Sequence, residues 1–150
     1  MVWGAFHLGG ISELVFVNRV DGRAYRDILE NHLLPFGRRT IGESNTWTLM
    51  DDNATPHRAN LVQDWKRVNN ISTLPWPSKS PDLNPIEHLW DFLKRKIERQ
   101  DRPPQTLAEL RQSIIFQWQQ IPPELVRNLV SSLPSRLAAV RISNGWYTRY

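Results

Sequence analysis

The chain has 150 residues, enough for one domain of ordinary size and too few for two full domains. Hydrophobic residues make up 40% of it and seven are tryptophan, which is the composition of a folded protein and not of a disordered one. There is no cysteine, which excludes a disulfide framework and a zinc site built on thiolates. No stretch approaches the ~18 apolar residues of a membrane span, and the first residues lack a signal-peptide pattern, so we expect a protein that is neither secreted nor in a membrane.

The net charge of +4 and the isoelectric point near 9.8 suit a polyanionic partner, because each phosphate contact depends on a Lys or Arg. Many basic proteins of this size bind no nucleic acid, so charge alone does not identify the partner. The partner has to be inferred from motifs.

Two short apolar segments, 1–6 and 14–17, open the chain. A Gly-Gly pair at 9–10 separates them, and an Asp-Gly turn pair at 21–22 follows the second. Apolar runs of this length between turn residues are typical of strands. We therefore expect two adjacent strands, paired antiparallel.

A helix is expected from Arg23 onward, because four apolar residues recur there at helical spacing until Pro35 and Gly37 end the pattern. These residues are Tyr25, Ile28, Leu29 and Leu33. Side chains in 46–50 then alternate with the period of a strand and lead directly into the acidic segment 51–53. The sequence thus predicts carboxylates at the C-terminal end of a strand.

Beyond this point the chain is expected to be mostly helical. A short helix at 61–68 and a short strand at 71–74 precede a loop rich in proline, 75–85. The next helix has Glu87 in its first turn, and two more helices follow the Pro-Pro pairs of the C-terminal part. Their apolar faces are Ile86, Leu89, Trp90, Leu93 and Ile97; then Leu107, Leu110, Ile114, Trp118 and Ile121; then Leu125, Val126, Leu129 and Val130.

Asp52 and Glu87 are the candidate catalytic and metal-binding residues. Hard divalent cations take oxygen ligands, and two ions held ~3.5–4 Å apart can stabilise both the attacking and the leaving oxygen in phosphoryl transfer. An acid at a strand end and another at a helix start can converge at one rim of a sheet. Spacing alone nevertheless favours a structural role, with Asn84 and Glu87 forming a capping box and Asp52 closing a turn.

The letters around these two acids point to chemistry instead. MDDNATPHRA, followed by LPWPSKSPDLNPIEHLWDFLKRKI, closely resembles the second and third acid motifs of Tc/mariner DDE transposases, DNAPxHxA and WPxxSPDLNPIExxW. The 34 residues between Asp52 and Glu87 match the spacing of the Tc branch. VWGAF, GRAYRDILENHLLPF and LAAVRISNGWYTRY also resemble family segments, so the resemblance covers nearly the whole chain.

The resemblance implies an α/β fold, a ribonuclease-H-like mixed sheet flanked by helices, here with a helical C-terminal part. It also implies a site of two Mg²⁺ or Mn²⁺ ions held by Asp, Asp and Glu, with Asp52 as the second acid and Glu87 as the third. The first acid belongs in the family to a strand upstream of VWG. We therefore expect residues 1–150 to be a partial catalytic domain, lacking its first strand and the family's N-terminal helix-turn-helix modules.

The family activity is metal-dependent DNA strand cleavage and strand transfer. The resemblance implies DNA as the partner, both at the transposon end and at the target, and it is compatible with a homodimer. We expect no membrane association and no small-molecule substrate. The location that the resemblance implies is the nucleus. With two of three acids, the chain alone is expected to be inactive. A sheet without its first strand would also expose an edge, so low solubility or self-association is expected. The alternative function is a decayed or domesticated remnant acting as a non-catalytic nucleic-acid-binding or interaction module.

Asp52 is preferred over its neighbour Asp51 because adjacent strand residues face opposite ways and only Asp52 has the motif's spacing. The candidate DNA-binding residues are Arg58, Lys94 and Arg95. Arg58 lies just after the second acid motif, and the other two lie on a basic side of the helix that contains Glu87. For each of them, a solvated helix surface remains the alternative interpretation. Two further residues are considered for phosphate contacts, His57 without preference and Lys79 as less favoured. Asp91 is expected to pair with Arg95 rather than to bind metal.

Overall fold

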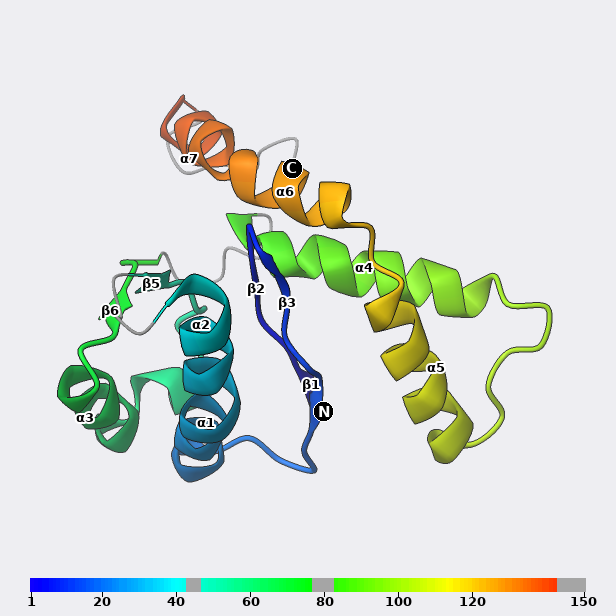
Figure 1. Cartoon of the computed structure of the whole chain (residues 1–150), viewed down its shortest axis with the longest axis horizontal. Helices are drawn as coiled ribbons and strands as arrows, with labels where there is room; N and C mark the ends of the chain where they lie inside the picture. The colour runs from blue at the N-terminus through cyan, green and yellow to red at the C-terminus, as the bar shows by residue number, and fades with distance from the viewer. Residues whose placement is uncertain (43–46, 77–82, 143–150) are drawn as a thin grey trace. The chain divides into compact units, whose positions relative to one another are not determined.

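The computed structural model describes residues 1–42, 47–76 and 83–142. The chain divides into two compact units, Met1–Ser80 and Pro81–Tyr150, and each is described by itself. All six strands found among the described residues lie in the first unit, and the described part of the second unit, 83–142, is helical (Figure 1).

The first unit begins with an antiparallel hairpin, as the sequence predicted. Strand β1 (Val2–Trp3) pairs with β4 (Val15–Phe16), and β2 (Phe6–His7) pairs with β3 (Gly10–Ile11). The ladder is interrupted between these pairs, where the buried Ser12 hydroxyl accepts the Ala5 N–H at 2.8 Å. The two short ladders therefore belong to one hairpin, whose tight turn lies at residues 8–9.

His7, near the turn of this hairpin, is held as a neutral imidazole. The Gly9 N–H donates to His7 Nδ1 at 2.9 Å, so Nδ1 is the acceptor and the opposite ring nitrogen, Nε2, donates to Thr40 Oγ1 at 2.7 Å. Burial lowers the pKa of His7 below its ordinary value of 6.5. A second proton would occupy the nitrogen that accepts the Gly9 N–H.

Acidification is therefore expected to weaken this unit through His7. Because the pKa is lower in the folded chain, the unfolded chain takes up the proton first, and stability falls as the pH drops below about 6.5. Melting temperatures measured from pH 7.5 to pH 5.0 should decline less steeply for His7→Asn than for the unsubstituted chain. Parallel declines would show that His7 does not contribute.

Three consecutive helical segments follow, α1 (Gly22–Ile28), a π-helical turn η1 (Leu29–Leu33) and α2 (Leu34–Ile41). Figure 1 shows α1 and α2 in line with one another. The prediction that the helix ends at Pro35 was wrong. The Leu34 N–H bonds to Leu29 O, five residues back, so the ladder is already widened where the proline lacks an N–H and its ring would crowd a normal turn.

The two further strands expected from the sequence are present, and they pair in parallel. Strand β5 (Thr48–Leu49) pairs with β6 (Ser72–Thr73), and the chain between them forms the 3-10 helix η2 (Thr55–Arg58) and helix α3 (Asn60–Val68). The described strands thus include both antiparallel and parallel pairs, consistent with a mixed α/β fold. The acidic segment 51–53 lies in this connection, between the end of β5 and the start of η2.

The core of the first unit joins α1 to α3. Its buried members are Tyr25, Leu29, Leu33 and Val62, and the partly buried side chains around them are Trp3, Ala5, Val20, Trp47, Leu49, Ala59 and Trp65. The start of α1 lies close to Ala59, because a Cβ added at Gly22 would lie 2.6 Å from the Ala59 Cβ. This packing holds α1 against the segment that follows β5.

The second unit consists of α4 (Pro85–Glu98), α5 (Leu107–Gln119), α6 (Pro123–Ser131) and α7 (Leu133–Ile142). Helices α4 and α5 pack through stacked Trp90 and Trp118 rings, with centroids 5.2 Å apart. The predicted apolar faces are largely confirmed, but Leu107, the first residue of α5, is 85% exposed.

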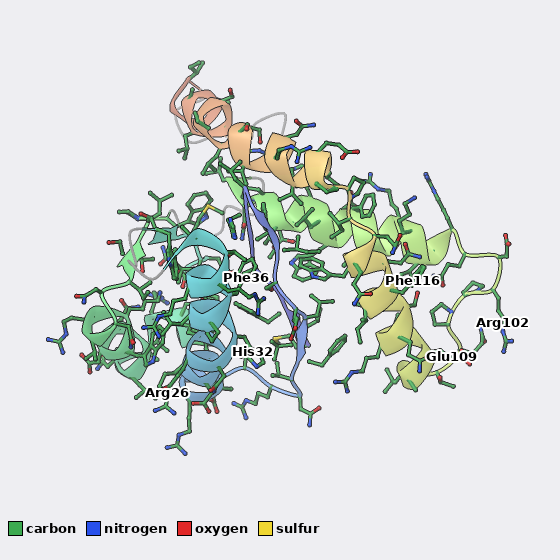
Figure 2. The ribbon with its side chains drawn as sticks, viewed as in Figure 1. Arg26, His32, Phe36, Arg102, Glu109 and Phe116 are labelled. Carbon is green, nitrogen blue, oxygen red and sulfur yellow. The ribbon has the colours of Figure 1, made fainter. Side chains whose placement is uncertain are left out.

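Side chains cap the start of α5. Thr106 Oγ1 accepts the Glu109 N–H at 3.1 Å, and the Glu109 carboxylate accepts the Gln105 N–H at 2.7 Å. Figure 2 labels Glu109 at this end of α5 and Phe116 two turns along it. Within the described ranges, the helices are too short or too polar to cross a membrane.

Candidate metal-binding site

Asp52 follows β5 and has a carboxylate with one oriented oxygen. Its Oδ1 accepts the Ala54 N–H at 3.1 Å and lies 2.7 Å from His57 Nδ1. The side chain is 57% exposed, and among the described residues no hydrogen bond to Oδ2 is found. The group therefore has a fixed direction and an oxygen open to a ligand from solvent.

His57 donates to Asp52 through Nδ1. This nitrogen lies 2.7 Å from Asp52 Oδ1 and 2.9 Å from the Asp52 main-chain carbonyl, and because both oxygens are acceptors, Nδ1 must carry a proton. The imidazole stacks on the Tyr25 ring with centroids 3.9 Å apart and planes inclined by 28°. The orientation of His57 thus depends on a side chain from α1.

Asp51 faces the opposite way, as strand alternation predicted. Its Oδ2 accepts the Tyr25 hydroxyl at 3.0 Å and the Lys66 ammonium at 2.7 Å, and the two charged side chains are only 10% and 4% exposed. Burial raises the pKa of Tyr25 well above its ordinary value, and the Asp51 carboxylate adds to this effect, so the phenol keeps its proton and remains a donor. Asp51 is occupied by internal partners.

The hydrogen bonds of Tyr25 and Lys66 to Asp51 were not predicted from the sequence. A lysine on a short helix normally extends into water, and nothing in its spacing from Asp51 reveals a pair across the fold. One available signal is the position of Lys66 four residues after Val62, on the buried side of α3. Asn53 also joins the site to a distant segment, because its side-chain amide donates to the Trp76 carbonyl.

Glu87 lies in the first turn of α4 and is exposed. The helix begins as predicted, with Pro85 at its first position and the Asn84 Oδ1 accepting the Ile86 N–H at 3.4 Å. The next residue, His88, accepts a hydrogen bond from the buried Arg136 guanidinium at 2.8 Å, which joins α7 to the start of α4. Rigid helical backbone therefore carries Glu87.

Asp52 belongs to the first unit and Glu87 to the second, so the convergence of the two carboxylates is part of the proposal below. Within the described ranges, no group of three or more His, Asp or Glu side chains is gathered as a metal would require. The donors themselves fit a hard cation, since carboxylate oxygens suit Mg²⁺ or Mn²⁺ and the chain has no thiolate.

The candidate DNA-binding residues lie on exposed helix surfaces. Arg58 is exposed at the end of η2. On α4, Arg95 forms the expected pair with Asp91 at 2.7 Å, and Lys94 lies 3.9 Å from Glu98. Lys79 lies outside the described residues. The assignment of Arg58, Lys94 and Arg95 to DNA binding stays a prediction.

Comparison with known proteins agrees with this fold and these motifs. The family model of the DDE superfamily endonucleases matches residues 2–111. The Tcb1 transposase of Caenorhabditis briggsae is 38% identical over 153 residues, which cover 100% of this chain and 54% of Tcb1. The Tc3 transposase of Caenorhabditis elegans is 36% identical over 146 residues, covering 97% and 44%. The chain thus spans about half the length of these transposases.

Solved structures give the same answer for the fold. The Mos1 transposase catalytic domain, in a structure with raltegravir and Mg, superposes with a TM-score of 0.87 at 21% identity, covering 99% of this chain and 76% of that one. This likeness confirms the ribonuclease-H-like α/β fold expected from the sequence. The chain belongs to the DDE superfamily endonucleases and, within them, to the Tc/mariner transposases.

Proposed function

We propose that residues 1–150 form part of the catalytic domain of a Tc/mariner transposase, which cleaves DNA strands and joins them to target DNA with the help of divalent metal ions. The observation that carries this proposal is the Asp52 carboxylate, which is oriented through Oδ1 and open at Oδ2 within the family's acid motif. A carboxylate used only to close a turn would not need a second donor from His57.

Asp52 and Glu87 are the residues that would hold the metal. Mos1 structures with Mg and with Mn support this choice of ion. When bound, such an ion stabilises the negative charge that develops on phosphoryl oxygens during strand cleavage. The task of the chain itself is to present the two carboxylates, Asp52 from the end of β5 and Glu87 from the capped start of α4.

DNA is the proposed partner. Mos1 has been solved in a paired-end complex and in a strand transfer complex, which supports DNA binding by this chain as well. A homodimer is part of the same proposal. The net charge of +4 agrees with a polyanionic partner. The nucleus is the proposed location, because the DNA that transposases of this kind act on is there.

Metal binding by the chain tests the site directly. Mn²⁺ is expected to broaden the amide NMR signals around Asp52 and Glu87 selectively, because a paramagnetic ion relaxes nearby protons. Asp52→Asn should weaken this broadening at both places, whereas Asp64→Asn, which neutralises an exposed acid on α3, should not. Equal broadening with and without Asp52 would contradict the proposed site.

Lys94 provides the test of DNA contact on α4. If it neutralises a phosphate, Lys94→Ala is expected to reduce the slope of log affinity against log salt by about 1. Arg127→Ala removes the same charge from an exposed position on α6 and serves as the control. Fluorescence anisotropy with a DNA duplex measures both slopes. An unchanged slope for Lys94→Ala would leave α4 as an ordinary solvated helix.

A further inference from the structure

A buried ion pair lies directly behind the proposed metal ligand. Lys66 is 3% exposed, and its ammonium contacts Asp51 Oδ2 at 2.7 Å. The same carboxylate oxygen accepts the hydroxyl of Tyr25, which is 2% exposed. Asp51 is the residue immediately before Asp52, so this pair adjoins the candidate site without being part of it.

The presence of this buried ion pair is not explained by its contribution to stability alone. Removing two charges from water is costly, and a buried pair is often no more stabilising than apolar side chains of similar size. What the pair does provide is a defined geometry, since the carboxylate has two donors that converge on one oxygen. Its effect should therefore be sought in the position of the groups that it holds.

The contacts lead from the ion pair to Asp52 through two rings. The Asp51 carboxylate fixes the Tyr25 hydroxyl, and the Tyr25 ring stacks on His57 at 3.9 Å. His57 Nδ1 then donates to Asp52 Oδ1 at 2.7 Å. All five side chains lie in the first unit, on α1, α3, η2 and the segment after β5.

We propose that the buried Asp51–Lys66 pair positions the metal ligand Asp52, acting through Tyr25 and His57. Lys66 and Tyr25 are then positioning residues, which touch neither metal nor DNA. Groups behind a ligand hold its orientation, and their loss typically lowers metal affinity by roughly 10–100-fold. This inference rests on the proposed function, because it assigns the network to the metal site proposed above.

The test compares variants that break the network with variants that only lower stability. Lys66→Met removes the partner of Asp51, and Tyr25→Phe keeps the stacked ring but removes its hydroxyl. Leu34→Ala, a buried position on α2 outside the network, matches the loss of stability, and Arg67→Ala removes an exposed charge next to Lys66. The double variant Asp51→Asn/Lys66→Met keeps an acceptor for Tyr25 without the charges.

Two measurements are made on the folded chain at pH 7.5. The first is the affinity for Mn²⁺, from the broadening described above. The second uses no metal: ¹⁵N NMR of the histidine side chains shows whether His57 carries its proton on Nδ1. We expect Lys66→Met and Tyr25→Phe to weaken Mn²⁺ binding about 10-fold and to mix the His57 tautomers. The double variant lacks the ion pair, so it should stay impaired in both measurements, and the two controls should change neither.

The outcomes separate this proposal from the function on which it rests. Wild-type Mn²⁺ affinity in Lys66→Met and Tyr25→Phe would overturn the positioning role, as would equal losses in Leu34→Ala. If the unsubstituted chain binds Mn²⁺ no better than Asp52→Asn, the proposed metal site fails instead. The His57 tautomer then still decides whether the ion pair orders Asp52: a change in Lys66→Met supports that link, and no change overturns it.

Discussion

DNA strand cleavage is expected to fall by more than roughly 100-fold when Asp52 is replaced by Asn or Glu87 by Gln, which exceeds the usual loss from residues outside the ligand shell. An amide has nearly the same shape as a carboxylate. In Asp52→Asn the amide oxygen can still accept the bonds that Ala54 and His57 now donate to the carboxylate, so the fold should be kept while the anionic ligand is lost. The predicted effect is therefore on chemistry and not on folding.

Because the chain spans 54% of Tcb1, the measurement uses a chimera in which it replaces the matching part of that transposase. Nicking of a supercoiled plasmid is followed with Mg²⁺ and with Mn²⁺. Asp64→Asn and Glu98→Gln are the controls, since each removes an exposed acid from α3 or α4. Cleavage that survives Asp52→Asn would contradict the assignment. DNA binding by the chimera without metal-dependent cleavage would favour the alternative of a non-catalytic binding module.

Lys66→Met is expected to destabilise the first unit by about 3–5 kcal/mol, because it leaves the Asp51 carboxylate buried and unpaired. The methionine fills a similar volume, so the loss is electrostatic rather than a cavity effect. Asp51→Asn/Lys66→Met should recover more than half of the loss, since the neutral amide still accepts the Tyr25 hydroxyl.

Urea unfolding followed by tryptophan fluorescence measures these differences. Arg67→Met is the matched control, because its pair with Asp64 is exposed and such pairs contribute about 0–1 kcal/mol. A loss below about 1 kcal/mol for Lys66→Met would mean that the chain relaxes and lets water reach Asp51. Failure of the double variant to recover would mean that the charges themselves stabilise the unit.

Local patterns predicted most of the elements. The alternation before Asp51 and Asp52 placed a strand there, and the opposite directions of these two side chains follow from the same period of two. The cap at Asn84 and the apolar face of α4 were predicted because helix starts and helical spacing depend on neighbouring residues. The helix end expected at Pro35 was wrong, because a π turn accommodates the proline, and a widened ladder has no sequence signature.

The sequence by itself determined the family and identified Asp52 and Glu87 as the acids to test, because the motifs around them are short contiguous segments. Such segments can be recognised without knowing how the chain folds. Only the tertiary structure decided which side chains form the network that contacts Asp52. Lys66 lies 15 residues from Asp51 along the chain, and Tyr25 lies 26 residues away. Their contacts depend on how α1 and α3 pack around Val62, and burial turns an ordinary helix lysine into the partner of a hidden carboxylate.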